Sequence, residues 1–241
     1  MTASAINRYA RQIVLPGFGP IHQRALTDAH VSVVGAGGLG SPALLYLAGA
    51  GVGHLQIIEN DVVALVNLHR QVIHSEAAVG TSKAESAREH LSELNSDISI
   101  EICEVMLTAD NATEVLAGSD VVLDATDNFA ARHCVSVACA ELGIPHVWAA
   151  VLGYETQLSV FHAGRGPIYE DLYPTPPAPS KQQTCVEAGV LGPVVGMAGA
   201  MMATETIKLL TGLGEPLIGT VAFYDFTSGR WDYVPLATRS R

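Results

Sequence analysis

The sequence predicts an α/β protein whose doubly wound, Rossmann-like sheet is mainly parallel and ends in antiparallel C-terminal strands. Over residues 1–150, short apolar runs alternate with stretches of helical periodicity, the pattern of parallel strands joined by crossover helices. A glycine-rich turn, GAGGLG, separates the first apolar run from the helical stretch after it, and doubly wound folds hold a nucleotide at such a turn. The chain has 241 residues, enough for one sizeable core, so we expect a single domain over residues 1–241.

The elements follow in order from the N-terminus. Residues 4–27 predict helices around a turn at LPGFGP. Strands are predicted for the short apolar or alternating runs HVSVVGAG, HLQIIEN, ISIEICEV, DVVLDATDN, PHVWAAV and TQLSVFHA. Helices are predicted between them over Gly38–Gly51, Thr81–Asn95 and Asn128–Leu142.

The helix over Thr81–Asn95 carries the clearest local signals. One apolar face is formed by residues at i, i+3, i+7 and i+10, namely Ala84, Ala87, Leu91 and Leu94. Ser82 stands where an N-cap is expected, and Glu85 follows three residues later. Together they predict a capping box at the start of this helix.

The C-terminal part of the chain predicts a long loop, a helix and a hairpin. Residues 164–184 contain five prolines and few apolar residues, so we expect a mobile surface loop without a packed element, and loops of this length are usually functional or disordered. Pro193–Leu210 predicts a helix of small residues, with proline near its start and Gly212 after its end. The segment TVAFYDFTSGRWDYVPL predicts a hairpin that turns at Ser228-Gly229.

The composition excludes several function classes. The formal net charge is −11, which argues against nucleic acid or an anionic membrane as a partner. No stretch offers about 20 uninterrupted apolar residues, and the start MTASAINRYARQIV lacks the apolar region of a signal peptide. Four scattered cysteines suit a reducing compartment. We therefore expect a cytoplasmic protein with no membrane span.

The glycine-rich turn predicts a nucleotide site. The motif G-x-G-x-x-G is matched by Gly35, Gly37, Gly38 and Gly40. Glycine lets the backbone approach a phosphate, and the helix N-terminus adds free N–H groups and the positive end of its dipole. Glu59 ends the next strand, where an acid can bond a ribose hydroxyl, and Asp61 follows it. The alternative is that these small residues only let the helix pack closely on the sheet.

Polar residues after the strands indicate which nucleotide chemistry to expect. Asn67 and Arg70 follow the second strand, Lys83 opens the next helix, and Asp127-Asn128 end the run VVLDAT, where open parallel sheets place ligands. Taken singly, Arg70 or Lys83 is typical of a solvated surface charge. Together, in a chain with only 13 Lys and Arg, they favour a triphosphate, because cations and Mg²⁺ neutralise phosphate charge and an Asp can hold the metal.

Several long segments resemble the ThiF/MoeB family, bacterial relatives of ubiquitin-activating enzymes. The matching segments are RYARQIVLPGFG, VSVVGAGGLGSPALLYLAGAGVGHLQIIEND, NLHRQVIH, VGTSKAESA, DVVLDATDNFAAR and TCVEAGVLGPVVGMAGAMMATETIKLLTG, which together span roughly residues 8–212. The resemblance implies an adenylyltransferase, a nucleotidyltransferase that uses Mg-ATP and releases pyrophosphate. Its substrate would be the C-terminal glycine carboxylate of a ubiquitin-fold sulfur carrier like ThiS or MoaD, whose acyl-adenylate is then converted to a thiocarboxylate, as in thiamin or molybdopterin biosynthesis.

The resemblance also implies roles for individual residues. Gly38 lies in the nucleotide loop, and Glu59 takes the ribose-binding position at which the family more often has Asp. The phosphate-contacting positions correspond to Asn67, Arg70 and Lys83, and the acid associated with Mg²⁺ corresponds to Asp127. Arg11, in RYARQI, matches an arginine that family members donate to the ATP of the other subunit. The resemblance therefore implies a homodimer, with a sulfurtransferase or cysteine desulfurase as the source of sulfur.

Cys185, in TCVEAG, has two interpretations. Some family members bond a cysteine at this position covalently to the carrier or to sulfur, whereas related enzymes adenylate without using it. The alternative is a small packed thiol. Cys103 lies in a predicted strand and Cys134 and Cys139 in a predicted helix, so we expect all three in the core.

The sequence departs from the family at a zinc site that many relatives hold with two CxxC pairs. The first pair would fall near Ile168 and Asp171, and the second would follow the last strand, in PLATRSR; none of these residues is cysteine. The nine histidines show no metal-ligand spacing. We therefore expect no zinc.

Two other function classes compete with adenylation. A Rossmann oxidoreductase dependent on NAD(P) would need a nicotinamide pocket and a hydride-transfer acid, for which no residues stand out. A non-catalytic module that binds a ubiquitin-like protein would not need Arg11, Arg70, Lys83 and Asp127. The sequence does not distinguish among the possible carriers.

Overall fold

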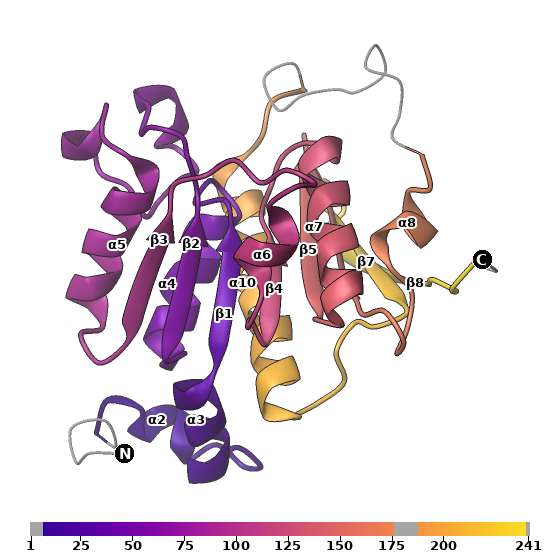
Figure 1. Ribbon diagram of the computed structural model, residues 1–241, viewed down its shortest axis with the longest axis horizontal. Coiled ribbons are helices and arrows are strands. Elements are labelled where there is room, and N and C mark those ends of the chain that lie inside the picture. Colours follow the sequence, from indigo (N-terminus) through magenta and orange to yellow (C-terminus); the bar gives the residue numbers. More distant parts are fainter. Residues whose placement is uncertain (1–6, 176–187, 240–241) are drawn as a thin grey trace.

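The computed structural model describes residues 7–175 and 188–239. They form an eight-stranded sheet in the order β3-β2-β1-β4-β5-β6-β7-β8 (Figure 1). The strands are β1 (His30–Val34), β2 (His54–Ile58), β3 (Ser99–Cys103), β4 (Val121–Asp124), β5 (His146–Leu152), β6 (Glu155–Phe161), β7 (Thr220–Asp225) and β8 (Arg230–Pro235). The strands from β3 to β5 in this order pair in parallel, and β6, β7 and β8 join them antiparallel. The predicted fold class is confirmed.

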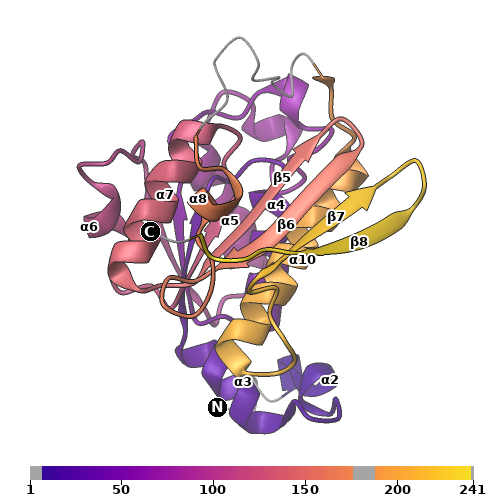
Figure 2. The same cartoon turned by 90° about the vertical axis from the view of Figure 1, so that its right-hand side faces the viewer.

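Helices cover both faces of the sheet. They are α2 (Ala10–Ile13), α3 (Gly19–Asp28), α4 (Gly40–Ala50), α5 (Lys83–Leu94), α6 (Ala112–Leu116), α7 (Phe129–Leu142), α8 (Tyr169–Leu172) and α10 (Gly192–Thr211), with the 3₁₀ turns η1 (Leu65–Asn67) and η2 (Glu76–Ala78). The helix α10 packs on α4 and lies along β4, β5 and β6. The helix α7 packs on β4 and β5, and α6 and α8 pack against α7. Figure 2 shows α7 and α8 on one side of the sheet and α10 on the other. None of the helices in the described ranges combines the length and the apolar character that a membrane crossing requires.

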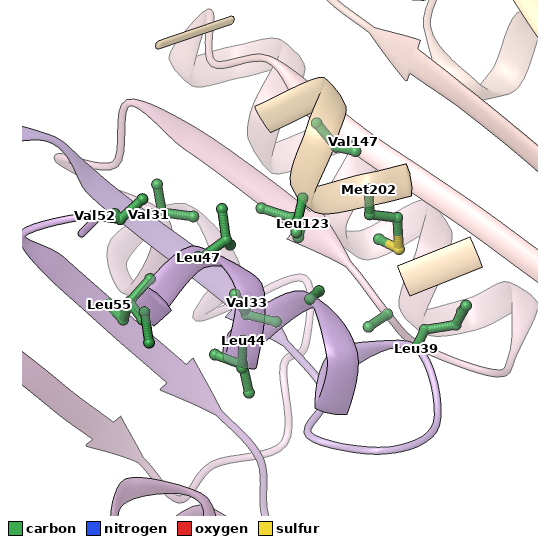
Figure 3. Packing of buried hydrophobic residues seen from close by; sticks show 14 of the residues in the cluster. Val31, Val33, Leu39, Leu44, Leu47, Val52, Leu55, Leu123, Val147 and Met202 are labelled. Carbon is green, nitrogen blue, oxygen red and sulfur yellow. The ribbon is translucent and has the colours of Figure 1, made fainter. Parts of the chain in front are cut away.

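The main core lies between the sheet and the α4–α10 layer. Figure 3 shows Leu44 and Leu47 of α4 beside Val31 and Val33 of β1, all of them fully buried. Small residues bring the two helices together: a Cβ at Gly199 of α10 would lie 2.2 Å from the Leu39 carbonyl oxygen. Because α4 cannot move away from this packing, its N-terminal end and the turn before it are held against β1.

Most predicted elements are confirmed with small shifts at their ends. The helices α2 and α3 flank the LPGFGP turn of the N-terminal segment, and β7 and β8 form the predicted hairpin. Ser82 caps α5, since its Oγ accepts a hydrogen bond from the Glu85 N–H at 3.3 Å. The capping box is only half formed, because the Glu85 carboxylate pairs with Arg88. The elements α6, η1 and η2 were not predicted, because each is too short to show a period.

Part of the proline-rich segment folds, so the prediction of an unpacked loop over residues 164–184 is wrong for α8. Tyr169 is fully buried there, with its ring 5.4 Å from that of Trp148 and 5.7 Å from that of Phe161. The aromatic contacts come from strands that precede the segment in the chain. They provide the packing that its own composition does not indicate, while residues 176–184 lie outside the described ranges.

Hydrogen bonds join α8 to the end of the described chain. The buried Asp171 accepts from the Ile168 N–H at 2.8 Å and from the Arg239 N–H at 3.0 Å. The Arg239 Nε–H donates to the Asp171 carbonyl at 3.0 Å. Ile168 and Asp171 lie near the positions where the first cysteine pair of a zinc site was expected. A carboxylate and an arginine therefore connect the two segments that a zinc site would otherwise link, and the absence of zinc stays a prediction.

Candidate active site

A cleft opens where the strand order reverses. The strands β1 and β4 are neighbours, and the chain leaves them toward opposite sides of the sheet, which makes a crevice at their carboxyl ends. Its volume is about 1140 Å³, above the usual range of roughly 300–1,000 Å³ for small-molecule sites. Its charged and amide lining residues include Glu59, Asp61, Arg70, Gln71, Lys83, Asp127 and Asn128.

The glycine-rich turn forms one wall of this cleft. Gly35 has a φ of +98°, a conformation that side chains rarely adopt. Gly35, Gly37 and Gly38 line the cleft, but Gly40 does not. A Cβ at Gly40 would lie 1.9 Å from the Gly35 carbonyl oxygen, so Gly40 allows the turn to close onto the start of α4. The structure therefore separates one packing glycine from three that face the cleft.

Two glycines of α4 test this distinction. We expect Gly40→Ala to destabilise the protein by about 1–3 kcal/mol, because the methyl group overlaps backbone that has no room to move. Gly49→Ala on the same helix is the control: Gly49 is exposed, and no atom lies within 4 Å of its added Cβ. This change should stabilise by about 0.5–1 kcal/mol, because alanine has the higher helix propensity. Urea unfolding measures both, and equal stability of the two variants would contradict the close turn.

Glu59 is fixed against the turn. Its Oε2 accepts a hydrogen bond from the Ala36 N–H at 3.0 Å, and its Oε1 accepts from the Asn60 and Asp61 N–H groups, each at 2.9 Å. The carboxylate thus lies at the end of β2, where the ribose-binding acid was predicted. The same carboxylate thus binds backbone of the glycine-rich turn and backbone of the segment after β2.

Lys83 brings a nearly buried cation to the cleft. Its Nζ lies 2.7 Å from Oδ2 of Asp61, and the Lys83 side chain is 6% exposed while that of Asp61 is 60% exposed. The hydrogen bond from Lys83 lowers the pKa of Asp61. Water screens the charge of Asp61, because its side chain is largely exposed. Asp61 therefore offsets the positive charge of Lys83 less than a buried carboxylate would. The ammonium remains available to a second anion.

Arg70 lies beside the glycine-rich turn and is oriented by Asn67. The Arg70 Nη2–H donates to Oδ1 of Asn67 at 2.9 Å. The Arg70 side chain runs beside Gly38, whose added Cβ would lie 3.5 Å from the Arg70 Cγ. Arg70 lines the cleft and Asn67 does not. Asn67 was predicted as a phosphate contact; in this structure its side chain holds the arginine.

The fourth strand supplies the acid predicted to bind the metal. Asp127 is exposed and lines the cleft just beyond β4. Asn128 caps α7, because its Oδ1 accepts from the Ala131 N–H at 2.9 Å. The described ranges contain no cluster of three or more acidic, histidine or cysteine side chains suited to a metal. One exposed carboxylate fits Mg²⁺ that arrives with a nucleotide, since this ion is usually held by one or two carboxylates and the phosphates.

Asp124 shapes the turn that carries Asp127, although sequence analysis did not single it out. It is fully buried, and its Oδ1 accepts from the Thr126 N–H at 3.0 Å and the Thr126 hydroxyl at 2.6 Å. His146 approaches its Oδ2 at 3.1 Å. Burial opposes the charge of Asp124, but the hydrogen bonds from His146 and Thr126 outweigh it and lower its pKa. The segment DATDN contains two acids, and only the structure shows which one is buried.

Two more polar residues were missed, and both belong to the segment NLHRQVIH. Gln71 is 5% exposed and lines the cleft, and its Oε1 finds no hydrogen-bond partner among the described residues. His74 is 8% exposed, and its ring contacts the carbonyl oxygen of Ala36 in the turn. The matching segment NLHRQVIH indicated that this part of the chain belongs to the site. The residue types alone did not indicate which way the side chains of Gln71 and His74 point.

Arg11 does not join the site of its own chain. It is exposed on α2 and does not line the cleft. Figure 1 shows α2 near the start of β1, at the end of the sheet away from the strand ends that form the cleft. Any role of Arg11 at a cleft therefore requires a second chain.

Three of the four cysteines lie among the described residues. Cys185 lies outside the described residues. Burial raises the pKa of Cys103, Cys134 and Cys139, which disfavours the thiolate. Cys139 is buried in a hydrophobic cluster that Cys103 and Cys134 pack against, and Cys134 also reaches the lining of the cleft. The three residues predicted for the core do pack there.

Comparison with known proteins gives consistent matches over nearly the whole chain. A sequence profile of the ThiF family matches residues 9–241. An adenylyltransferase and sulfurtransferase MOCS3-1 of Zea mays is 47% identical over 236 residues, which cover 98% of this chain and 50% of the relative. The probable adenylyltransferase/sulfurtransferase MoeZ of Mycobacterium tuberculosis is 44% identical over 229 residues, covering 93% and 58%. The chain thus spans about half the length of the curated relatives it matches.

Solved structures share the fold at lower identity. Escherichia coli MccB, in a crystal structure with ATP, aligns with a TM-score of 0.86 and 22% identity, over 99% of this chain and 75% of that one. PaaA aligns with a TM-score of 0.83 and 20% identity, over 99% and 76%. At these identities the likeness concerns the fold alone.

Proposed function

The chain belongs to the ThiF family, and from this membership and the contents of the cleft we propose that it is one adenylation domain acting on a sulfur carrier. The reaction is ATP-dependent adenylation of the C-terminal glycine carboxylate of a ubiquitin-fold protein like ThiS or MoaD. It gives an acyl-adenylate and pyrophosphate ahead of thiocarboxylate formation. The activity named for the MOCS3 and MoeZ relatives supports this proposal.

The observation that carries the proposal is the position of Lys83. A lysine whose side chain is 6% exposed and pairs with the hydrated carboxylate of Asp61 faces the same cleft as the glycine-rich turn and Arg70. Hydride transfer from a nicotinamide needs no such cations. A triphosphate needs them, because charge builds on its oxygens as pyrophosphate leaves.

Each group of cleft residues is assigned to one part of the ATP molecule. N–H groups of the turn and the N-terminal end of α4 address the phosphates, Lys83 and Arg70 neutralise their charge, and Glu59 meets the ribose. The apolar side chains of Met106 and Leu107 in the same cleft suit the base. Asp127 would hold Mg²⁺ with the phosphates, and this ion would supply further neutralisation of charge.

No general base is required. The carrier's terminal carboxylate is already an anion, and one of its oxygens forms the new bond to the α-phosphorus while the bond to pyrophosphate breaks. The obstacle is the approach of an anion to a polyanion, which the cations relieve. Positioning of the tail beside the α-phosphate contributes the rest.

The proposal includes the arrangement of the protein in the cell. We infer a cytoplasmic homodimer in which Arg11 of one chain approaches the phosphates bound by the other. A sulfurtransferase or cysteine desulfurase is the class of partner that supplies sulfur to the acyl-adenylate. Cys185 is proposed as a site of covalent attachment of the carrier or of sulfur.

Pyrophosphate release tests the proposed function. With Mg-ATP and a carrier ending in glycine, we expect pyrophosphate and a carrier whose mass has increased by one adenylyl group, that is AMP minus water. Carriers of the ThiS and MoaD types are compared, and the same carriers without the terminal glycine serve as controls. Binding of NAD without binding of ATP, measured by calorimetry, would support an oxidoreductase instead. Carrier binding without pyrophosphate would support a non-catalytic module.

A further inference from the structure

Both backbone polar groups of one residue in the glycine-rich turn are held by side chains. Ala36 lies between Gly35 and Gly37, and its N–H donates to Oε2 of Glu59 at 3.0 Å. Its carbonyl oxygen lies 3.0 Å from Nε2 of His74. A turn rich in glycine has many conformations of similar energy, so these two contacts select one of them.

His74 connects this turn to the helix that begins with Lys83. Its Nδ1 lies 3.0 Å from Oγ of Ser86, one turn along α5. A carbonyl oxygen only accepts hydrogen bonds, so Nε2 carries the proton and Nδ1 accepts from the Ser86 hydroxyl. His74 and Ser86 are each 8% exposed. One neutral imidazole therefore spans the distance between the turn and α5.

The charges around the ring favour this neutral form. Burial is the largest cause that lowers the pKa of His74, and Lys83 and His90 lower it further, while the Ala36 carbonyl and Glu59 act in the opposite direction. The net direction is downward, so the ring stays neutral near pH 7 and adds no charge to the cleft. Its contribution is geometric.

We propose that His74 is a positioning residue of the nucleotide site, which fixes the Ala36 peptide relative to α5 so that the turn and Lys83 address the same phosphate chain. This inference rests on the proposed function and adds a residue to it. A turn that is ordered before the ligand arrives loses less conformational entropy on binding. Loss of the His74 contact should therefore weaken ATP binding, and the carrier should be affected little.

Three substitutions separate the two contacts of the ring. His74→Ala removes both, and we expect it to raise the KM for ATP about tenfold, with an unchanged KM for the carrier. His74→Gln retains a donor near the position of Nε2 and should stay close to wild type. His74→Asn places its amide near the position of Nδ1 and should resemble His74→Ala. The Kd for ATP, measured by calorimetry without carrier, should follow the same order.

His162 offers a matched control for loss of a buried histidine. It is also 8% exposed, and its Nε2 lies 3.3 Å from the carbonyl oxygen of Gly143, which ends α7 and does not belong to the glycine-rich turn. His162→Ala should lower the melting temperature without changing the KM for ATP.

The outcomes are separable. If His74→Ala loses only thermal stability, as His162→Ala does, and keeps the wild-type KM and Kd for ATP, His74 is a structural residue and the inference is wrong. If His74→Gln weakens ATP binding as much as His74→Ala does, the contact with the Ala36 carbonyl does not support ATP binding and the inference is wrong. Wild-type protein that binds ATP but adenylates no carrier overturns the proposed function, while the calorimetric series still tests His74. Wild-type protein that does not bind ATP overturns both.

Discussion

Lys83→Met is expected to reduce the rate of pyrophosphate release by roughly 10²–10³, the usual effect of removing one well-placed donor to developing charge. The protein should still fold. Methionine fills the space of the lysine stem, and Asp61, with 60% of its side chain exposed, is left in water and not as a buried unpaired charge. Steady-state assays with saturating ATP and carrier measure the effect.

Lys208 provides the control for this substitution. Its Nζ lies 2.6 Å from Oε1 of Glu205, and its side chain is 29% exposed, but it lies on α10 outside the cleft lining. Lys208→Met leaves Glu205, whose side chain is 0% exposed, without this cation, so it should lower the melting temperature. Because the substitution lies outside the proposed site, pyrophosphate release per folded molecule should equal that of wild type. Equal losses for the two variants would mean that Lys83 acts through folding.

Arg11→Ala and Asp127→Ala are expected to be inactive as separate homodimers and to recover activity when mixed. If Arg11 serves the partner's site, a mixed dimer has one site with both lesions and one intact site. Random exchange makes about half of the dimers mixed, so activity should approach about a quarter of wild type for a symmetric dimer with independent sites. The physical reason is that α2 lies away from the cleft of its own chain, so that only a second copy brings the guanidinium to the phosphates.

Verified exchange of subunits is essential to this test. Native mass spectrometry of chains that differ in isotope label shows whether mixed dimers form. Arg24→Ala, which removes an exposed arginine on the neighbouring α3, should be fully active alone. No recovery in a sample with proven mixed dimers would reject the action of Arg11 in trans, while the adenylation chemistry would stand on the other residues.

Local patterns were sufficient to predict the elements that position the site. The unit β1–α4–β2 is set by apolar runs and a glycine turn that are contiguous in the chain, so its bounds were close to those observed. The helix α8 could not be found in this way. Tyr169 is buried because Trp148 and Phe161 lie beside it, and those contacts exist only after the sheet has formed.

The candidate site was predictable in its charges but not in its connections. Arg70 and Lys83 stood out because the chain has only 13 Lys and Arg, and Asp127 stood out because it follows a predicted strand. Asn67 orients Arg70, and His74 joins the turn to α5. These positioning roles depend on contacts between atoms of different elements. Residue type alone does not predict such contacts.

The link between Asp171 and Arg239 has a consequence for how the end of the described chain is held. A structural zinc site contributes roughly 10–16 kcal/mol, whereas a hydrogen bond contributes about 0.5–1.5 kcal/mol net. Residues 236–239 are held by contacts of this smaller size: Arg239 bonds to Asp171 of α8, and the Leu236 N–H donates to the Gly219 carbonyl oxygen at 2.9 Å. A segment held by contacts of this size can open locally while the rest of the fold stays intact.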